Sequence, residues 1–254
     1  MLRFFGKKLE EMGRYFVFVG ETLGYLSRRP FRIGQYIAEI ERLGVNSVLI
    51  IFLSGGAIGM IFALQMAALL QQFQAEIGTG AAVSVALARE LAPVITTLML
   101  IAKNGSAMAA ELGTMQVTEQ IDALESMSIS ALHYLVLPRV VASVLAFPVL
   151  TLLANVIGAV GAYVVSVSLY AIDSAGYLDY LFSFLRPRDV YIGLIKAAIM
   201  GFIVSTVCCF YGLRTSQGAK GVGDSATKAV VVSSVSILVT DYFLTSFMIR
   251  IIYA

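Results

Sequence analysis

The sequence predicts an all-α, polytopic membrane protein. We expect amphipathic helices in the membrane interface at residues 1–43, then a transmembrane domain of five helices at residues 44–254, with a short cytoplasmic helix at about 115–128 between the second and third spans. Hydrophobic residues make up 59% of the chain and charged residues 13%, whereas about 25% of the residues of a soluble domain are charged. Five apolar segments each exceed the roughly 20 residues that cross a bilayer.

The N-terminal region is amphipathic and basic. Apolar residues recur at spacings of three and four from Phe5 to Leu23, with charged residues between them. This pattern is typical of a helix in the membrane interface, although an amphipathic helix packed on protein has the same pattern. The segment Arg28-Arg29-Pro30 predicts a helix break, with Pro30 in the first turn of a second helix. Eight of the 18 Lys and Arg residues precede the first span, which places the N-terminus in the cytoplasm.

The five predicted spans are the apolar segments 43–75, 82–112, 140–172, 190–213 and 229–251. An odd number of spans puts the C-terminus on the opposite side of the membrane from the N-terminus, outside the cytoplasm. Gly55, Gly56 and Gly59 in the first span permit close approach of another helix.

Three connecting segments have distinct compositions. Thr118 is a candidate N-cap of a short amphipathic helix, about three turns long, with an apolar strip at Val117, Ile121 and Leu124. We expect residues 173–189 to form an aromatic surface segment, and residues 214–228 to form a basic, Gly-rich cytoplasmic loop.

The second span is unusual because it carries Arg89, Glu90, Lys103 and Glu111. A charge at bilayer depth costs about 2.5–3.5 kcal/mol on insertion scales, so charged spans usually face a cavity, a partner or an interface. Arg89 and Lys103 are 14 residues apart, which returns them to within roughly 40° of one helix face. Both could line one cavity; the alternatives are a salt bridge for Arg89 and a lysine that extends to the interface for Lys103.

Several functions are excluded or disfavoured. The chain has no G-x-x-x-x-G-K-[ST] motif, so it does not bind ATP through a P-loop. The G-x-G-x-x-A match at 221–226 lacks a β-α-β context. A single histidine and two adjacent cysteines give no metal site and no catalytic residues, and a net charge of +2 does not indicate nucleic-acid binding. We therefore predict that the chain is not an enzyme and holds no cofactor.

Four motifs resemble the MlaE permease family, the membrane subunits of ABC-type phospholipid transporters that work with MCE proteins. They are R-E-L-A-P-V at 89–94, K-N-G-S-A-M-A-A-E-L-G-T-M at 103–115, T-E-Q-I-D-A-L-E-S-M at 118–127 and L-P-R at 137–139. Ala92 stands where the family commonly has Gly. The resemblance implies a homodimeric permease of the bacterial inner membrane that holds phospholipid between its two copies.

The resemblance also implies partners and site residues. The expected partners are a cytoplasmic ABC ATPase, which would bind ATP and Mg, a periplasmic MCE-domain protein and often a small STAS-domain subunit. The residues expected at the lipid are Arg89, Glu90, Lys103, Gln65 and Phe73. The residues expected to couple to the ATPase are Glu119, Gln120, Asp122, Leu124 and Glu125. A solvated charged turn is the simpler interpretation of this last group.

Two other function classes remain open at this point. One is an ion-gradient-driven secondary transporter of a hydrophobic solute, with Asp241, Glu111 and Lys103 as a proton relay; many such transporters contain internal repeats, and this sequence shows none. The other is a lipid-binding membrane scaffold that does not transport.

Overall fold

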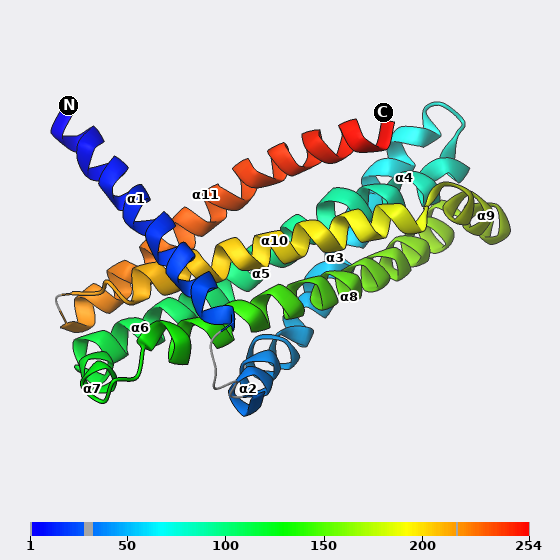
Figure 1. Ribbon diagram of the computed structural model, residues 1–254. Helices are drawn as coiled ribbons and strands as arrows, with labels where there is room; N and C mark the ends of the chain where they lie inside the picture. Colours follow the sequence, from blue (N-terminus) through cyan, green and yellow to red (C-terminus); the bar gives the residue numbers. More distant parts are fainter. Residues whose placement is uncertain (1, 28–32, 217, 254) are drawn as a thin grey trace.

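A computed structural model describes residues 2–27, 33–216 and 218–253, and Figure 1 shows the arrangement of the helices. Within these residues every regular element is helical. The α-helices are α1 (Leu2–Gly24), α2 (Ile33–Leu43), α3 (Val48–Gln71), α4 (Thr79–Ala86), α5 (Ala92–Leu100), α6 (Ser106–Val117), α7 (Gln120–Ser126), α8 (Leu137–Tyr170), α9 (Ser174–Phe184), α10 (Pro187–Gly212) and α11 (Gly218–Tyr253). The predicted break at Arg28-Arg29-Pro30 lies outside the described residues.

Five stretches of the described chain are long and apolar enough to cross a membrane, as predicted. They are Ile33–Gln71, Glu76–Val117, Leu132–Tyr170, Pro187–Gly212 and Gly218–Met248. The second stretch joins α4, α5 and α6 through two π-helical turns, η4 (Leu87–Leu91) and η5 (Ile101–Gly105). A third π-turn, η6 (Leu132–Val136), leads into α8. Turns of this kind are frequent at functional sites because they reorient side chains within a helix.

Helices α3 and α8 cross in close contact, as the glycines of the first span predict. A Cβ atom added at Gly59 would lie 2.1 Å from the carbonyl oxygen of Gly158. A Cβ added at Gly55 would lie 3.0 Å from the Cα of Ala154. Backbone-to-backbone packing replaces side-chain contacts here, which is how small residues stabilise helix pairs in lipid.

The segment after the second span differs in detail from the prediction. Helix α7 has seven residues, about two turns, and Thr118 does not cap it. The hydroxyl of Thr118 instead donates to the carbonyl of Thr114 at 2.8 Å. Glu119 occupies the N-cap position with a left-handed φ of 59° and makes no side-chain cap. The chain thus turns sharply at Glu119, where α6 ends and α7 begins.

Two other connecting segments are more ordered than their composition indicates. Most of the aromatic segment forms α9, in which Phe182 is 75% exposed but Tyr177 is completely buried against Tyr163. The expected Gly-rich loop is largely helical, because α11 already begins at Gly218. Gly221 is buried in that first part of α11, so glycine here serves packing rather than loop formation. Helices α7 and α9 lie at opposite ends of the bundle (Figure 1).

Candidate functional site

The π-turn η4 positions the first two charged residues of the site. Arg89 and Glu90 lie within it, and Pro93 follows in the first turn of α5. In an α-helix the carbonyl of residue 89 would accept from the N–H of residue 93, and proline has no N–H. The ammonium of Lys196 donates to the Arg89 carbonyl instead, at 3.1 Å. The sequence R-E-L-A-P therefore leaves a backbone acceptor that a cation from another helix satisfies.

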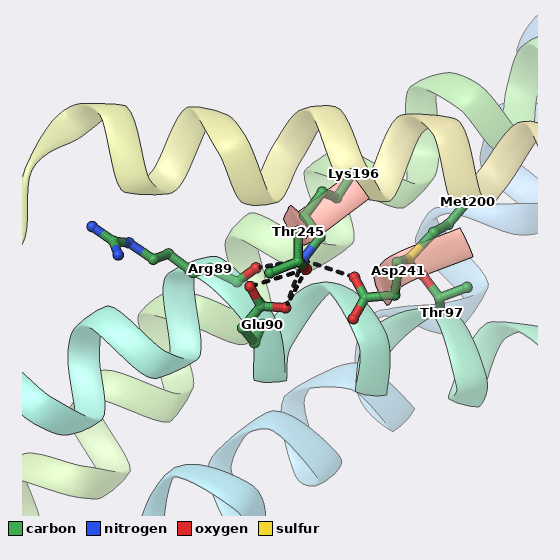
Figure 2. A network of polar contacts seen from close by, with 7 residues as sticks. All are labelled: Arg89, Glu90, Thr97, Lys196, Met200, Asp241 and Thr245. Atoms are coloured by element: carbon green, nitrogen blue, oxygen red, sulfur yellow. Dashed lines mark hydrogen bonds and ion pairs between the residues drawn. The ribbon is translucent and has the colours of Figure 1, made fainter. Parts of the chain in front are cut away.

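Lys196 is the centre of a buried polar cluster, shown in Figure 2. Its side chain is 0% exposed, and its Nζ lies 2.6 Å from Glu90 Oε2 and 2.7 Å from Asp241 Oδ1. Nζ also donates to the hydroxyl of Thr245 at 2.8 Å, and that hydroxyl donates to Glu90 Oε2 at 3.1 Å. The ammonium donates its three hydrogens to Glu90, Thr245 and the Arg89 carbonyl, and the carboxylate of Asp241 lies beside it as a second ion pair. The cluster joins η4, α10 and α11.

Arg89 makes a second ion pair close by. Its side chain extends away from the Lys196 cluster (Figure 2), and its Nε and Nη2 lie 2.8 Å and 2.7 Å from Asp189 Oδ1. Asp189 is buried at the start of α10, where its other oxygen accepts from the backbone N–H of Arg186 at 3.0 Å. Arg89 therefore forms a salt bridge, one of the alternatives that the sequence left open.

Gly193 allows α10 to approach η4 closely enough for these pairs to form. A Cβ added at Gly193 would lie 2.1 Å from the carbonyl oxygen of Ala88. Asp189, Gly193 and Lys196 are spaced by four and three residues, so they share one face of α10. On that face, Asp189 precedes Gly193 and pairs with Arg89 of η4. Lys196 follows Gly193 and pairs with Glu90 of η4.

A cavity of about 360 Å³ opens beside this site. Its walls are formed by Phe184 of α9, by Arg89 and Glu90, and by small apolar residues of α4. The residues of α4 are Ala81, Ala82, Val85 and Ala86. The side chains of Arg89 and Glu90 are 29% and 40% exposed, whereas Lys196 is sealed. The surface of the cavity is almost wholly apolar, and the charged residues Arg89 and Glu90 lie at its edge, an arrangement that fits an amphipathic ligand with polar groups at one end.

Lys103 does not share this cavity with Arg89. Its ammonium donates to the carbonyl of Asn46 and, at 3.0 Å, to the hydroxyl of Ser47, in the turn between α2 and α3. The neighbouring Asn104 donates to the carbonyl of Leu43 at 2.9 Å. The prediction that Arg89 and Lys103 share a helix face assumed a regular helix, and the π-turns η4 and η5 break that regularity. Lys103 fastens the α2–α3 turn in this structure.

Gln65 and Phe73 lie apart from the charged residues. Gln65 is exposed on α3, and Phe73 is 72% exposed just beyond the end of α3. Neither residue lines the cavity beside Arg89. Both sit on the outer surface of this single chain.

The residues expected to meet an ATPase lie together on α7. Glu119, Gln120, Asp122 and Glu125 are exposed, while Ile121 is buried and Leu124 is half-buried. Ile121 and Leu124 pack into a cluster that includes Phe18 of α1, Leu135 of η6 and Phe210 of α10. An acidic surface is thus presented on a short helix whose opposite side is anchored in the bundle.

The proposed proton-relay residues have three separate sets of partners. Asp241 pairs with Lys196, Glu111 pairs with Arg42 and Arg139, and Lys103 contacts the α2–α3 turn. The structure therefore does not bring Asp241, Glu111 and Lys103 together.

Sequence reasoning did not place Asp189, Lys196 and Thr245 at the site. A signal for Lys196 was available: like Asp241, it is a charge within an otherwise apolar span, and the cost argument applied to Arg89 applies equally to it. Pro93, four residues after Arg89, was a second signal, because it leaves the Arg89 carbonyl without its helical hydrogen bond and open to a donor from another helix. Thr245 has no such signal, because hydroxyls are common in transmembrane helices.

The chain matches known proteins over almost its whole length. The model of the family described as Permease MlaE matches residues 36–247. A probable ABC transporter permease protein of Rickettsia bellii is 36% identical over 95% of this chain and 93% of its own length. The intermembrane phospholipid transport system permease protein MlaE of Haemophilus influenzae is 36% identical over 84% of this chain and 82% of its own length. A probable ABC transporter permease protein of Synechocystis is 38% identical over 92% and 87%. With the family model spanning the described bundle and these identities, the chain belongs to the MlaE permease family.

Proposed function

We propose that this protein is the membrane subunit of an ABC-type transporter that moves phospholipid between the bacterial inner membrane and a periplasmic MCE-domain protein. A separate cytoplasmic ATPase binds ATP and Mg and drives the movement, and a small STAS-domain subunit is a further expected partner. Family membership supports the permease role, and the name of the Haemophilus relative supports phospholipid as the cargo. The N-terminus is cytoplasmic and the C-terminus periplasmic in this proposal.

The observation that carries the lipid assignment is the pair of partly exposed opposite charges at the cavity beside η4. A phospholipid has a phosphate, often a nearby ammonium, and long apolar chains. Arg89 can exchange part of its pairing with Asp189 for a phosphate, because a guanidinium binds phosphates and carboxylates with the same planar geometry. Glu90 is 40% exposed and can accept from a headgroup ammonium. The apolar walls of α4 then contact the acyl chains.

Lys196 stabilises this arrangement of charges. It pairs with Glu90 and Asp241 at the same time and joins α10 and α11 to η4. The site contains two cations, Arg89 and Lys196, and three carboxylates, so its formal charge is −1. The carboxylates are those of Glu90, Asp189 and Asp241. A zwitterionic headgroup suits such a site better than a strongly anionic one, because its ammonium offsets the extra carboxylate.

Coupling to the ATPase proceeds through α7 in this proposal. The acidic face of α7, formed by Glu119, Asp122 and Glu125, docks into the ATPase, and its apolar face moves the cluster that contains Phe210 of α10. Helix α10 carries Asp189 and Lys196 at its other end. A displacement of α7 can therefore reach the lipid site along one continuous helix. Two copies of the chain form the complete cavity, which alternates in exposure as the ATPase closes and opens.

The complex of this chain with its ATPase, reconstituted in nanodiscs, tests the proposal. We expect phospholipid to co-purify with the complex and ATP hydrolysis to rise when phospholipid is added. A complex that never retains phospholipid would refute the cargo assignment. Transport that continues without ATP but collapses with the ion gradient would favour the secondary transporter. Lipid retention without any ATP-dependent transfer would favour the scaffold.

A further inference from the structure

A second ionic cluster, which takes no part in the proposed lipid site, joins three other helices. It contains Glu39 and Arg42 of α2, Glu111 of α6 and Arg139 of α8. Arg139 Nη2 lies 3.0 Å from Glu111 Oε2, and Arg139 Nε lies 3.6 Å from Glu39 Oε1. Arg42 Nη1 lies 2.7 Å from the same Glu111 oxygen and 3.9 Å from Glu39 Oε1. Two cations and two carboxylates balance, so the formal charge of the cluster is zero.

Arg139 is the buried member on which the others converge. It is 3% exposed, and its Nη1 donates to the carbonyl of Leu135, in the π-turn η6, at 2.8 Å. One guanidinium therefore contacts η6, α2 and α6 simultaneously. A planar group with five donors can make such a three-way contact, whereas a lysine ammonium acts as a point charge.

The cluster lies beside both ends of the α7 connection, which is the segment that runs from the end of α6 through α7 to η6. Helix α6, which carries Glu111, leads directly into α7, and η6 is where the chain returns from α7 into α8. Arg139 thus ties both arms of the α7 connection to α2. Helix α2 is in turn held to the second span, because Lys103 and Asn104 bind the backbone carbonyls of the α2–α3 turn.

Helix α3 completes a path back to the lipid site. It packs against α8 at Gly59 and Gly158, and the side chain of Leu87 lies beside Gly158. Leu87 is the first residue of η4, two positions before Arg89. Each step of this path is a direct contact, and energetic coupling along it requires a coupling measurement of its own.

We propose that Arg139 is a positioning residue for transport: it joins the α7 connection to α2, so that displacement of α7 moves α2 and α3 together with α6 and α8. This inference rests on the proposed function of α7 as the ATPase contact. A buried ion pair stabilises a protein no better than well-packed apolar residues of similar size. The cluster is therefore expected to be replaceable for folding but not for coupling.

The test compares a neutral version of the cluster with the wild type. In the variant Glu39→Gln, Arg42→Gln, Glu111→Gln, Arg139→Met, all four charges of the cluster are removed together, so no member keeps a charge without its partner. We expect this variant, purified with its ATPase, to keep its phospholipid and its ATPase subunit. We expect the stimulation of ATP hydrolysis by phospholipid to fall at least tenfold relative to wild type. Lys220→Gln, which removes an exposed charge on α11, serves as the matched control and should retain full stimulation.

A second variant tests the inference in case the first variant does not fold. Arg139→Lys keeps a buried cation but not the three-way geometry, so we expect it to fold and to show severalfold weaker stimulation. If either folded variant shows wild-type stimulation and lipid transfer, the inference is wrong. Measurements on the wild type distinguish the two proposals. If phospholipid does not stimulate ATP hydrolysis by the wild type, the proposed function is wrong. If the wild type and the variants are stimulated equally, only the role of Arg139 is wrong.

Discussion

Replacing Lys196 with methionine is the sharpest perturbation of the candidate site, because it removes the buried cation and keeps the length of the side chain. Nζ lies 2.6 Å from Glu90 and 2.7 Å from Asp241, and the lysine side chain is 0% exposed. Removing one partner of a buried ion pair costs about 3–5 kcal/mol. Glu90 is 40% exposed, so water offsets part of this cost and we expect the lower half of that range.

This loss of stability is large enough to measure. For a chain of about this size, 1 kcal/mol corresponds to roughly 2–4 °C in Tm, so Lys196→Met should lower the Tm in detergent by at least about 6 °C. The triple variant Lys196→Met, Glu90→Gln, Asp241→Asn leaves no unpaired carboxylate. It should recover at least half of the lost Tm while retaining little phospholipid, measured by mass spectrometry of the purified protein.

Two outcomes would refute this reasoning. A shift in Tm below about 2 °C for Lys196→Met would mean that the buried charge is not holding η4, α10 and α11 together. Recovery of wild-type phospholipid content in the triple variant would mean that the charges serve stability alone. The exposed-residue variant Lys220→Met is the control for loss of a lysine as such.

The remaining predictions concern the lipid, the coupling helix and the helix contact. Arg89→Ala should fold and should retain severalfold less phospholipid, with Arg89→Lys intermediate; wild-type lipid transfer by Arg89→Ala would leave only a structural role. Glu119→Lys with Asp122→Lys should abolish co-purification of the ATPase at unchanged Tm, and normal ATPase binding would contradict the docking role. Gly193→Ala should cost about 1–3 kcal/mol, because its Cβ would lie 2.1 Å from a backbone oxygen; an unchanged Tm would show that α10 can shift without strain.

The sequence predicted the spans well for a simple reason. A bilayer imposes a minimum length and a low charge on each crossing segment, and both are local properties of the chain. The glycine contact at Gly59 was also predictable, since only a residue without Cβ permits backbone contact there. The acidic face and apolar strip of α7 followed from helical periodicity, although its length and cap did not.

The charge pairs were not predictable in the same way. Arg89 and Asp189 are separated by 100 positions in the sequence, and nothing local to either residue says which helix lies beside it. The regular-helix prediction for Lys103 failed because a π-turn inserts an extra residue and rotates the remainder of the helix. The helical start of α11 at Gly218 was not predicted because several glycines in a basic segment are typical of a loop.

What the sequence alone determined is the five apolar spans, their approximate limits and the presence of charges that must be compensated inside the membrane. Those follow from the free energy of placing each residue type in hydrocarbon, which depends on the residue and its near neighbours. The tertiary structure alone decided how those charges are compensated: Lys196 between Glu90 and Asp241, and Arg139 among α2, α6 and η6. Electrostatic pairing falls off with distance in space, so it is settled only when the helices are packed.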